Sequence, residues 1–277
     1  MAPRAIPIYD MSCDLDTERR FGGLDRLYGP GALDALRAAR ATVVGLGGVG
    51  SWAAEALARC GIGTLTLIDL DHIAESNINR QVHALGRTLG QAKVQAMAER
   101  IRDISPQCVL NLVDDFLDPG NAAGLLADAE SVVLDCTDQV SAKIAMILQV
   151  RRTGAPLVVC GGAGGKTDPL ALRAGDLSEA VNDALLAKIR NQLRRQHGYP
   201  KASAAAGKPA RRVPKMKVRA LWVDQPARLP AAWTQDAEAP AGAPQGLSCA
   251  GYGSAVTVTA AMGLAAAHEV LRVVFPA

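Results

Sequence analysis

The sequence predicts an α/β fold in which helices cover both faces of a doubly wound, mostly parallel sheet. Two observations carry this prediction. Short apolar runs of strand length alternate with longer helical runs along residues 41–160. A glycine-rich turn also joins the first apolar run directly to the first helix. With 277 residues, 49% of them hydrophobic, the chain can bury a large core.

The expected elements follow the chain in order. The first strand lies within 41–46, and Ser51 opens a helix that stops at Gly61 and Gly63. The other expected strands are 65–68, 108–113, 131–136 and 156–160, and the other expected helices are 93–104, 121–127, 142–152 and 185–196. A last helix, 255–275, is interrupted by His268, Glu269 and Arg272, so we expect it in the core and not across a membrane.

The turn after the first strand predicts a phosphate site of the Rossmann-like type. Glycines allow the backbone to approach a ligand closely, and the N–H groups at the start of the next helix face an anion. Asp69 and Asp71 follow the second strand, at about the ~20-residue distance expected for an acid that binds a ribose. The turn glycines are Gly45, Gly47, Gly48 and Gly50.

Glycines alone would serve NAD, FAD, S-adenosylmethionine or ATP equally well. The polar residues that follow favour ATP, because phosphoryl and adenylyl transfer need positive charge around the phosphates and a carboxylate for Mg²⁺. Arg80, Lys93 and Asp138 supply that set. A nicotinamide enzyme would instead need an apolar slot here, so a non-catalytic or NAD-dependent protein is the less favoured hypothesis.

With these residues in order, the chain resembles the ubiquitin-activating (E1)-like adenylating enzymes, which activate a carboxylate with ATP. The resemblance covers about 20–165 and the C-terminal region. It implies that Asp71 binds the ribose with Asp69 in support, that Asn77, Arg80 and Lys93 bind the phosphates, that Gln81 contacts ATP, and that Asp138 holds Mg²⁺. It also implies a homodimer in which Arg26 reaches the neighbouring subunit's site, so that the catalytic residues are Arg80, Lys93, Asp138 and Arg26.

Simpler interpretations exist for single residues. Ser76 and Asn77 are typical of helix caps and turns. Lys93 would also suit a solvated helix face, and Asp135 suits a supporting role at a strand end better than a metal ligand.

The six cysteines contain no C-x-x-C pair. The branch of the family that activates sulfur-carrier proteins usually holds a zinc ion with two such pairs, so we expect no zinc site here. Cys60, Cys108, Cys136 and Cys160 lie in apolar runs and are expected in the core, in a reducing cytoplasmic compartment. Cys249 lies in a polar loop before the last helix and is a candidate reactive thiol. No export signal precedes Arg20.

Positive charge is concentrated in one segment. Eleven Lys or Arg residues and no acid lie between Lys188 and Arg219, which leaves 19 basic against 27 acidic residues elsewhere, a net charge of −8. Such a segment is either a solvated helix and linker or a surface for a polyphosphate such as tRNA. The candidate tRNA contacts are Lys188, Arg190, Arg194, Arg195, Arg211 and Arg212. We therefore expect a single domain over 1–277, with a nucleotide-binding core (20–180), a basic insertion (185–219) and a C-terminal cover with its helix (220–277).

Within the family, the chain resembles the branch that dehydrates N6-threonylcarbamoyladenosine at position 37 of tRNA. The features are the absence of zinc cysteines, the basic segment, and three local strings: Arg20-Phe21-Gly22-Gly23, Arg26-Leu27-Tyr28-Gly29 and Gly161-Gly162-Ala163-Gly164-Gly165. This resemblance implies ATP and Mg²⁺ as cofactors, with a monovalent cation (Na⁺ or K⁺) and a cysteine-desulfurase or sulfur-acceptor partner as further expectations. The alternative is an adenylyltransferase for the C-terminus of a small sulfur-carrier protein, of the thiamin or molybdopterin type.

Overall fold

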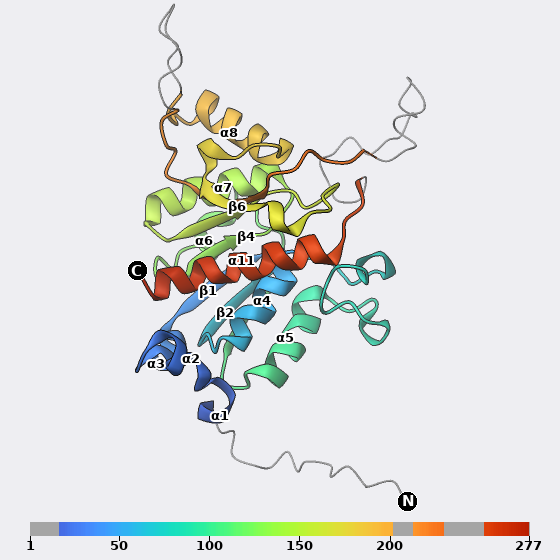
Figure 1. Cartoon of the computed structure of the whole chain (residues 1–277), viewed down its shortest axis with the longest axis vertical. Helices are drawn as coiled ribbons and strands as arrows, with labels where there is room; N and C mark the ends of the chain where they lie inside the picture. Colours follow the sequence, from blue (N-terminus) through green and yellow to red (C-terminus); the bar gives the residue numbers. More distant parts are fainter. Residues whose placement is uncertain (1–16, 202–212, 230–251, 277) are drawn as a thin grey trace, which may run out of the picture.

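A seven-stranded sheet with the order β3-β2-β1-β4-β5-β7-β6 forms the centre of the molecule (Figure 1). The computed structural model describes residues 17–201, 213–229 and 252–276. All neighbouring strands pair in parallel except β6, which is antiparallel to β7. The strands are β1 (Arg40–Val44), β2 (Thr64–Ile68), β3 (Val109–Val113), β4 (Val132–Asp135), β5 (Leu157–Cys160), β6 (Leu172–Asp176) and β7 (Arg219–Val223). The predicted doubly wound, mostly parallel sheet is confirmed.

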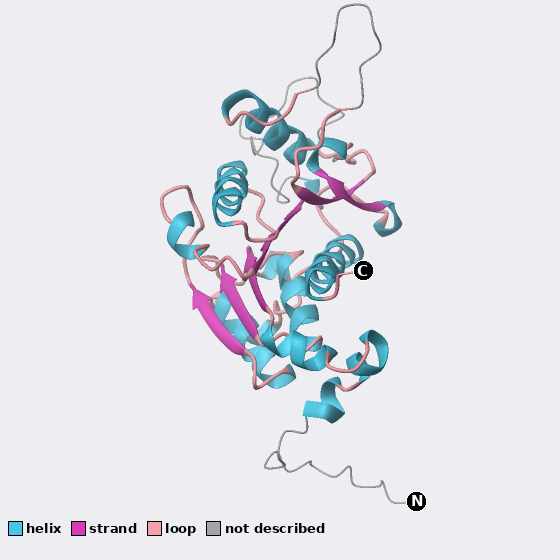
Figure 2. Ribbon diagram, turned by 90° about the vertical axis from the view of Figure 1, so that its left-hand side faces the viewer, coloured by secondary structure: helices cyan, strands magenta, loops and turns pink. Residues whose placement is uncertain are grey.

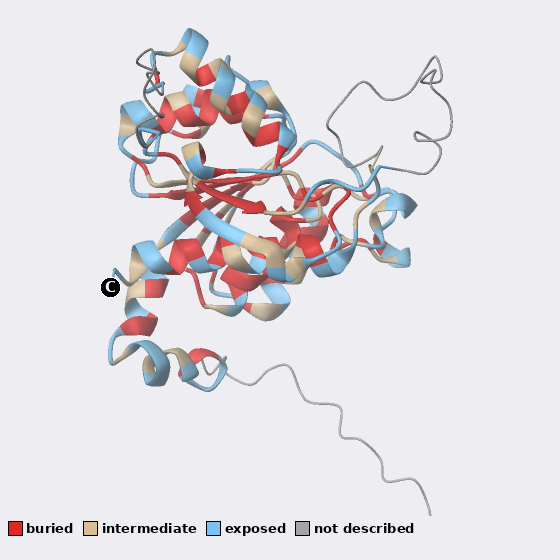
Figure 3. Cartoon of the chain, turned by 45° about the horizontal axis from the view of Figure 1, so that its top comes forward, coloured by how far each residue is buried: buried red, intermediate tan, exposed pale blue. Residues whose placement is uncertain are grey.

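Helices cover both faces of the sheet (Figure 2). On one face, α4 (Gly50–Arg59), α5 (Lys93–Ile104) and α11 (Val256–Val274) share one large apolar cluster with the strands. On the other face, α6 (Ala122–Leu125), α7 (Val140–Thr153) and α8 (Ala184–Gln196) pack in two further clusters. Figure 3 shows the buried residues gathered on the strands and the inner sides of these helices.

The expected strands and helices between 41 and 196 form within a few residues of their predicted limits. Two strands were missed. β6 reads Leu-Arg-Ala-Gly-Asp and carries little apolar character, so it has no strong pattern of its own. β7 begins at Arg219, the last residue of the predicted basic insertion (185–219). It reads Arg-Ala-Leu-Trp-Val and pairs with both β5 and β6.

The last helix, α11, packs lengthwise against α4. Its side chains at Val258, Met262, Ala266 and Val270 are fully buried, which confirms a core helix. Among the described residues, α11 alone has the length and composition of a membrane-crossing helix, and half of its apolar window is buried in the fold. At Gly263 an added Cβ would lie 2.4 Å from the Val49 carbonyl oxygen, so a side chain here would push α11 away from α4.

Three short helices, α1 (Thr17–Phe21), α2 (Gly23–Tyr28) and α3 (Ala32–Ala38), close the edge of the sheet where the parallel strands begin. The ring of Tyr28 stacks on Phe275, with ring centroids 4.6 Å apart, and ties α2 to the C-terminal end of α11. Arg20 donates to the main-chain oxygens of Asp103 and Ile104 at the end of α5. Cys108 and Cys160 are buried as expected, while Cys60 and Cys136 are half-buried against the core.

Candidate active site

The candidate site lies where the chain changes direction in the sheet, between β1 and β4. From β1 the chain continues to β2 and β3 on one side, whereas from β4 it continues to β5 on the other. Ligands of doubly wound folds bind at such a point, at the carboxyl ends of the strands. The loop after β1 touches the loop after β4, because a Cβ added at Gly45 would lie 3.1 Å from the carbonyl group of Cys136. Asp138 is thereby brought to the same edge as the glycine turn.

The glycine turn leads from β1 into α4. Gly45 has a φ of +87°, a left-handed conformation that favours glycine. At Gly50 an added Cβ would collide with the Gly45 carbonyl oxygen, so no side chain fits. A Cβ at Gly47 would face open space. Among the described residues, no acceptor is found for the N–H groups of Gly48 and Val49, which precede a ten-residue helix and suit an anion.

Asp69 fixes the turn from the end of β2. Its carboxylate accepts the Leu46 N–H at 2.5 Å and the Asp71 N–H at 2.9 Å, and its side chain is 8% exposed. Burial raises the pKa of Asp69, although nearby Lys93 and the two N–H donors oppose that rise. Asp71 differs, since its side chain is 57% exposed and opens to the edge of the sheet. Of the two acids, Asp71 is therefore the accessible one and Asp69 supports the loop.

Lys93 begins α5, and its side chain is buried, so it is not a solvated helix lysine. Its Nζ lies 2.7 Å from Asp71 Oδ2 and 3.8 Å from Asp69 Oδ1. The main chain reinforces this pairing, because the Lys93 N–H donates to the Asp71 carbonyl oxygen. One cation thus forms ion pairs with both acids at the end of β2, and its shorter contact is with Asp71.

Arg80 lies against the turn from the other side. A Cβ at Gly48 would lie 3.3 Å from Arg80 Cγ and 3.0 Å from Thr259 Cγ2. The Arg80 guanidinium donates to the Ser76 carbonyl oxygen and to the Asn79 side chain, and the Trp52 indole N–H donates to the Arg80 carbonyl oxygen. Among the described residues, no carboxylate pairs with Arg80, so its positive charge is available to a phosphate.

Two other predicted nucleotide contacts, Asn77 and Gln81, differ in their hydrogen bonding within the protein. The Asn77 side-chain oxygen accepts the Ala74 N–H and closes a single 3-10 turn, which is the local role that its residue type also suggested. Gln81 is buried, and its Oε1 atom has no hydrogen-bond donor in the part of the chain that the structure describes. Neighbouring His83 is also buried, and burial together with the charges of Lys93 and Arg100 lowers its pKa to about 4.

Asp138 follows β4 and is exposed, with a single 3.4 Å contact from the Gln139 side chain. Asp135, three residues earlier, is fully buried and forms a 3.0 Å ion pair with fully buried Lys143. Lys143 also donates to the Cys160 carbonyl oxygen, 2.7 Å away, and so joins the ends of β4 and β5. Burial raises the pKa of Asp135 against the opposing effect of Lys143. Asp135 is thus a supporting acid, as expected.

The remaining predicted residues lie apart from this group. Arg26 is an exposed residue of α2, at the edge where the strands begin and away from the glycine turn. On α8, Lys188 and Arg195 are exposed. Arg190 instead donates to the carbonyl oxygens of Leu177 and Ala180, and half-buried Arg194 donates to that of Pro200. Cys249, Arg211 and Arg212 lie outside the described residues.

Sequence reasoning missed residues that join the site to distant parts of the chain. Thr259 in the first turns of α11 contacts the glycine turn, and Asn79 donates to the Ser254 carbonyl oxygen just before that helix. Lys143 was also missed, although a lysine inside the apolar run 140–150, eight residues after an aspartate, is a signal for a buried ion pair.

Comparisons with known proteins agree with this geometry. The model of the ThiF family matches residues 23–276. The tRNA threonylcarbamoyladenosine dehydratase of Escherichia coli (strain K12) is 42% identical over 257 residues, and that of Haemophilus influenzae is 40% identical over 255 residues; each match covers 92% of both chains. The crystal structure of E. coli tRNA N6-threonylcarbamoyladenosine dehydratase in complex with ATP has a TM-score of 0.79 at 40% identity, over 94% of this chain and 95% of that one.

Proposed function

The chain belongs to the ThiF family, and from this we infer that it is an ATP-dependent dehydratase that cyclises N6-threonylcarbamoyladenosine at position 37 of tRNA. The observation that carries the proposal is the juxtaposition of the glycine turn, Arg80 and the Lys93–Asp71 pair at one edge of the sheet, in a chain that matches the two dehydratases over 92% of its length. The alternative, activation of a sulfur carrier, is less well supported, because the molybdopterin-synthase adenylyltransferases match only 40% of this chain.

The reaction begins with a carboxylate, which is a poor electrophile. A threonyl carboxylate oxygen would attack the α-phosphorus of ATP, the bond to the β-phosphate oxygen would break, and pyrophosphate would leave. The ureido group of the same nucleoside would then attack the acyl carbon, lose its proton and release AMP, so one carboxylate oxygen leaves with AMP and a ring closes. Because the nucleophile is already tethered, ring closure is effectively a unimolecular step.

The chain's own groups would stabilise the negative charge that accumulates on pyrophosphate. The N–H groups of Gly48 and Val49 and the start of α4 are fixed in place before the reaction, as is the Arg80 main chain through Trp52. Preorganised donors of this kind need no reorganisation as charge develops. Asp71 is the accessible acid for the ribose hydroxyl groups, and Asp69 holds the turn that faces the phosphates.

A magnesium ion fits the residues present. The described residues contain no cluster of three or more acidic, His or Cys ligands, and Mg²⁺ often binds through one or two carboxylates with substrate phosphates and water. Asp138 is exposed, forms one weak hydrogen bond among the described residues, and lies in the loop that touches Gly45. Asp138 would hold the ion, which would neutralise charge on the phosphates. A cytoplasmic homodimer completed by Arg26, a monovalent cation and a sulfur-transfer partner stay predictions.

The test is a direct assay of both candidate substrates. The protein is incubated with α-labelled ATP, Mg²⁺ and either tRNA that carries threonylcarbamoyladenosine or a sulfur-carrier protein. We expect the tRNA, and not the carrier protein, to stimulate AMP and pyrophosphate release. Mass spectrometry of the digested tRNA should then show a nucleoside lighter by one water. Stimulation by the carrier protein without change in the tRNA would overturn the proposal.

A further inference from the structure

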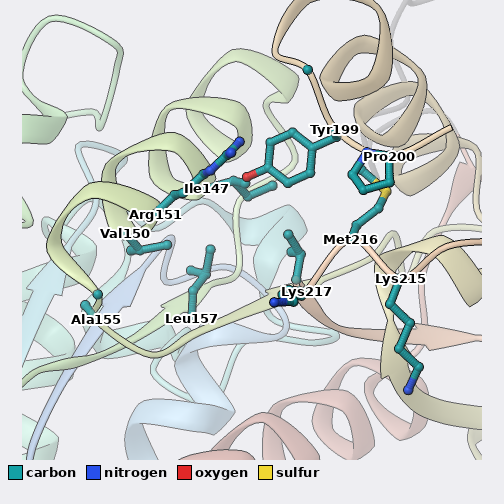
Figure 4. A pocket seen from close by; sticks show the side chains of 13 residues that line it. Ile147, Val150, Arg151, Ala155, Leu157, Tyr199, Pro200, Lys215, Met216 and Lys217 are labelled. Carbon is teal, nitrogen blue, oxygen red and sulfur yellow. The ribbon is translucent and has the colours of Figure 1, made fainter.

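A second cavity, of about 460 Å³, lies at the opposite edge of the sheet from the glycine turn (Figure 4). It is formed where α7 ends, where β5 begins and where the chain enters β7. Its lining is apolar at Ile147, Val150, Leu157 and Met216. Val150, which lines the cavity, is ten residues after the start of α7 at Val140, and with a rise of about 1.5 Å per residue the cavity is about 15 Å from the Asp138 end of that helix. It is therefore separate from the candidate active site.

Three cations line this cavity: Arg151, Lys215 and Lys217. All three are exposed, and within the described ranges none of them forms an ion pair with a carboxylate. No acidic residue is among the lining residues. The position of Lys217 is fixed by its main chain, because Asp176 accepts the N–H groups of both Met216 and Lys217. The cavity thus combines an apolar floor with uncompensated positive charge.

One wall is planar. The Arg151 guanidinium carbon lies 4.9 Å from the centre of the Tyr199 ring, and Figure 4 shows this pair on one side of the cavity with Lys217 on the other. Tyr199 is buried, so its ring holds Arg151 in place, whereas Arg151 itself is exposed. Nucleobases stack on aromatic rings and on arginine planes. A ligand with a flat ring and an attached anion matches this arrangement, in which the Arg151–Tyr199 pair and the apolar lining would hold the ring and the lysines would hold the anion.

The positive charge continues along α8. The Tyr199 N–H donates to the Leu193 carbonyl oxygen and Arg194 donates to that of Pro200, which lines the cavity, so the last turn of α8 adjoins it. Exposed Arg195 lies in that same turn. A ligand with repeated negative charges would be attracted along this surface, and one of its units would enter the cavity.

We propose that this cavity is a second nucleotide-binding site, which takes one unstacked nucleotide with its base beside the Arg151–Tyr199 pair and its phosphate at Lys215 and Lys217. The nucleotide could belong to an RNA chain or be free in solution. The positive charge that continues from the cavity onto α8 favours an RNA chain that also reaches the active site. A stacked strand rises about 3.4 Å per nucleotide, so about 15 Å corresponds to about four or five nucleotides, a distance that a hexanucleotide can span. Only the identity of the RNA as the tRNA substrate rests on the proposed function.

The test measures binding of a single-stranded RNA hexanucleotide and of UMP, each with the glycine turn occupied by a non-hydrolysable ATP analogue. The variant is Arg151→Gln/Lys217→Asn, where Asn is chosen because Lys217 has a φ of +57°. The matched control, Arg102→Gln/Arg173→Gln, removes two exposed cations that do not line the cavity. Thermal unfolding of both variants checks that the fold is retained.

We expect the cavity variant to weaken hexanucleotide binding about tenfold and the control to leave it nearly unchanged. If UMP binds as tightly as the hexanucleotide and the cavity variant loses UMP binding, the ligand is a free nucleotide. If only the hexanucleotide binds, the ligand is RNA. Either result supports the site. Equal affinities for parent and cavity variant overturn it. Failure of tRNA cyclisation with intact cavity-dependent binding would reject the proposed function and retain this site.

Discussion

Lys93 Nζ lies 2.7 Å from Asp71 Oδ2, so the lysine assigned to the phosphates is paired with the acid assigned to the ribose. The two assignments are therefore coupled, and a double-mutant cycle measures the coupling. We expect Lys93→Gln and Asp71→Asn each to weaken ATP binding, and the double variant to lose less than the sum, with an interaction energy of about 0.5–3 kcal/mol. Additive losses, measured by titration calorimetry, would show that the two residues act independently.

Asp69 and Asp71 are expected to differ in kind. Asp71→Ala should weaken ATP binding more than Asp69→Ala does, by about tenfold or more, because a hydrogen bond to a charged group contributes about 1.5–3 kcal/mol. Asp69→Ala should instead lower the free energy of unfolding by about 1–3 kcal/mol, because the Leu46 N–H would lose its acceptor. Calorimetric titration and thermal unfolding separate these effects. The reverse order of ATP affinities would transfer the ribose contact to Asp69.

Asp138→Ala should abolish Mg²⁺-dependent AMP formation and leave Tm within about a degree of the parent, because exposed surface substitutions usually change stability little. Asp103→Asn, which changes an exposed acid on α5, is the control and should remain active. Retained turnover in the Asp138 variant would remove this residue from the site.

The basic surface is expected to bind tRNA through its phosphates. Replacing Arg194, Arg195, Arg211 and Arg212 with Gln should weaken tRNA binding and reduce the slope of log K against log salt by up to about 0.9 for each lost phosphate contact. ATP affinity should hardly change, since the glycine turn and Arg80 belong to another part of the chain. Arg190 is excluded because its guanidinium joins α8 to Leu177 and Ala180 before the helix, whereas the Arg194 bond to Pro200 stays at the end of α8. An unchanged salt slope would leave the segment as a solvated linker.

His83 predicts a loss of stability in acid. Its pKa is lowered from 6.5 to about 4 in the folded protein, so the unfolded chain binds the proton more readily. The contribution of His83 to the free energy of unfolding is fully present above pH 6.5. It is lost as the pH falls from 6.5 towards 4, and the loss is at most about 3 kcal/mol. Unfolding by urea across this range should show the decline, and His83→Leu should flatten it. An equally steep decline in that variant would assign the effect to other groups.

The sequence by itself determined the strand, glycine turn and helix from 40 to 59, the helix 93–104 and the acids after β2 and β4, because these features rest on local periodicity and on residue types with few alternative uses. It also indicated a supporting role for Asp135 at the strand end, where the structure shows the ion pair with Lys143.

Tertiary structure decided which polar groups are free. Lys93 is buried beside two acids, the Arg190 guanidinium donates to main-chain oxygens, and the Asn77 side chain closes its own turn. All three belong to residue types that often bind ligands. It likewise paired β6 with β7 and brought Thr259 to the glycine turn, more than 200 positions along the chain. Such contacts join segments with no local signal for each other, because burial and charge pairing are properties of the packed chain and not of a stretch of sequence.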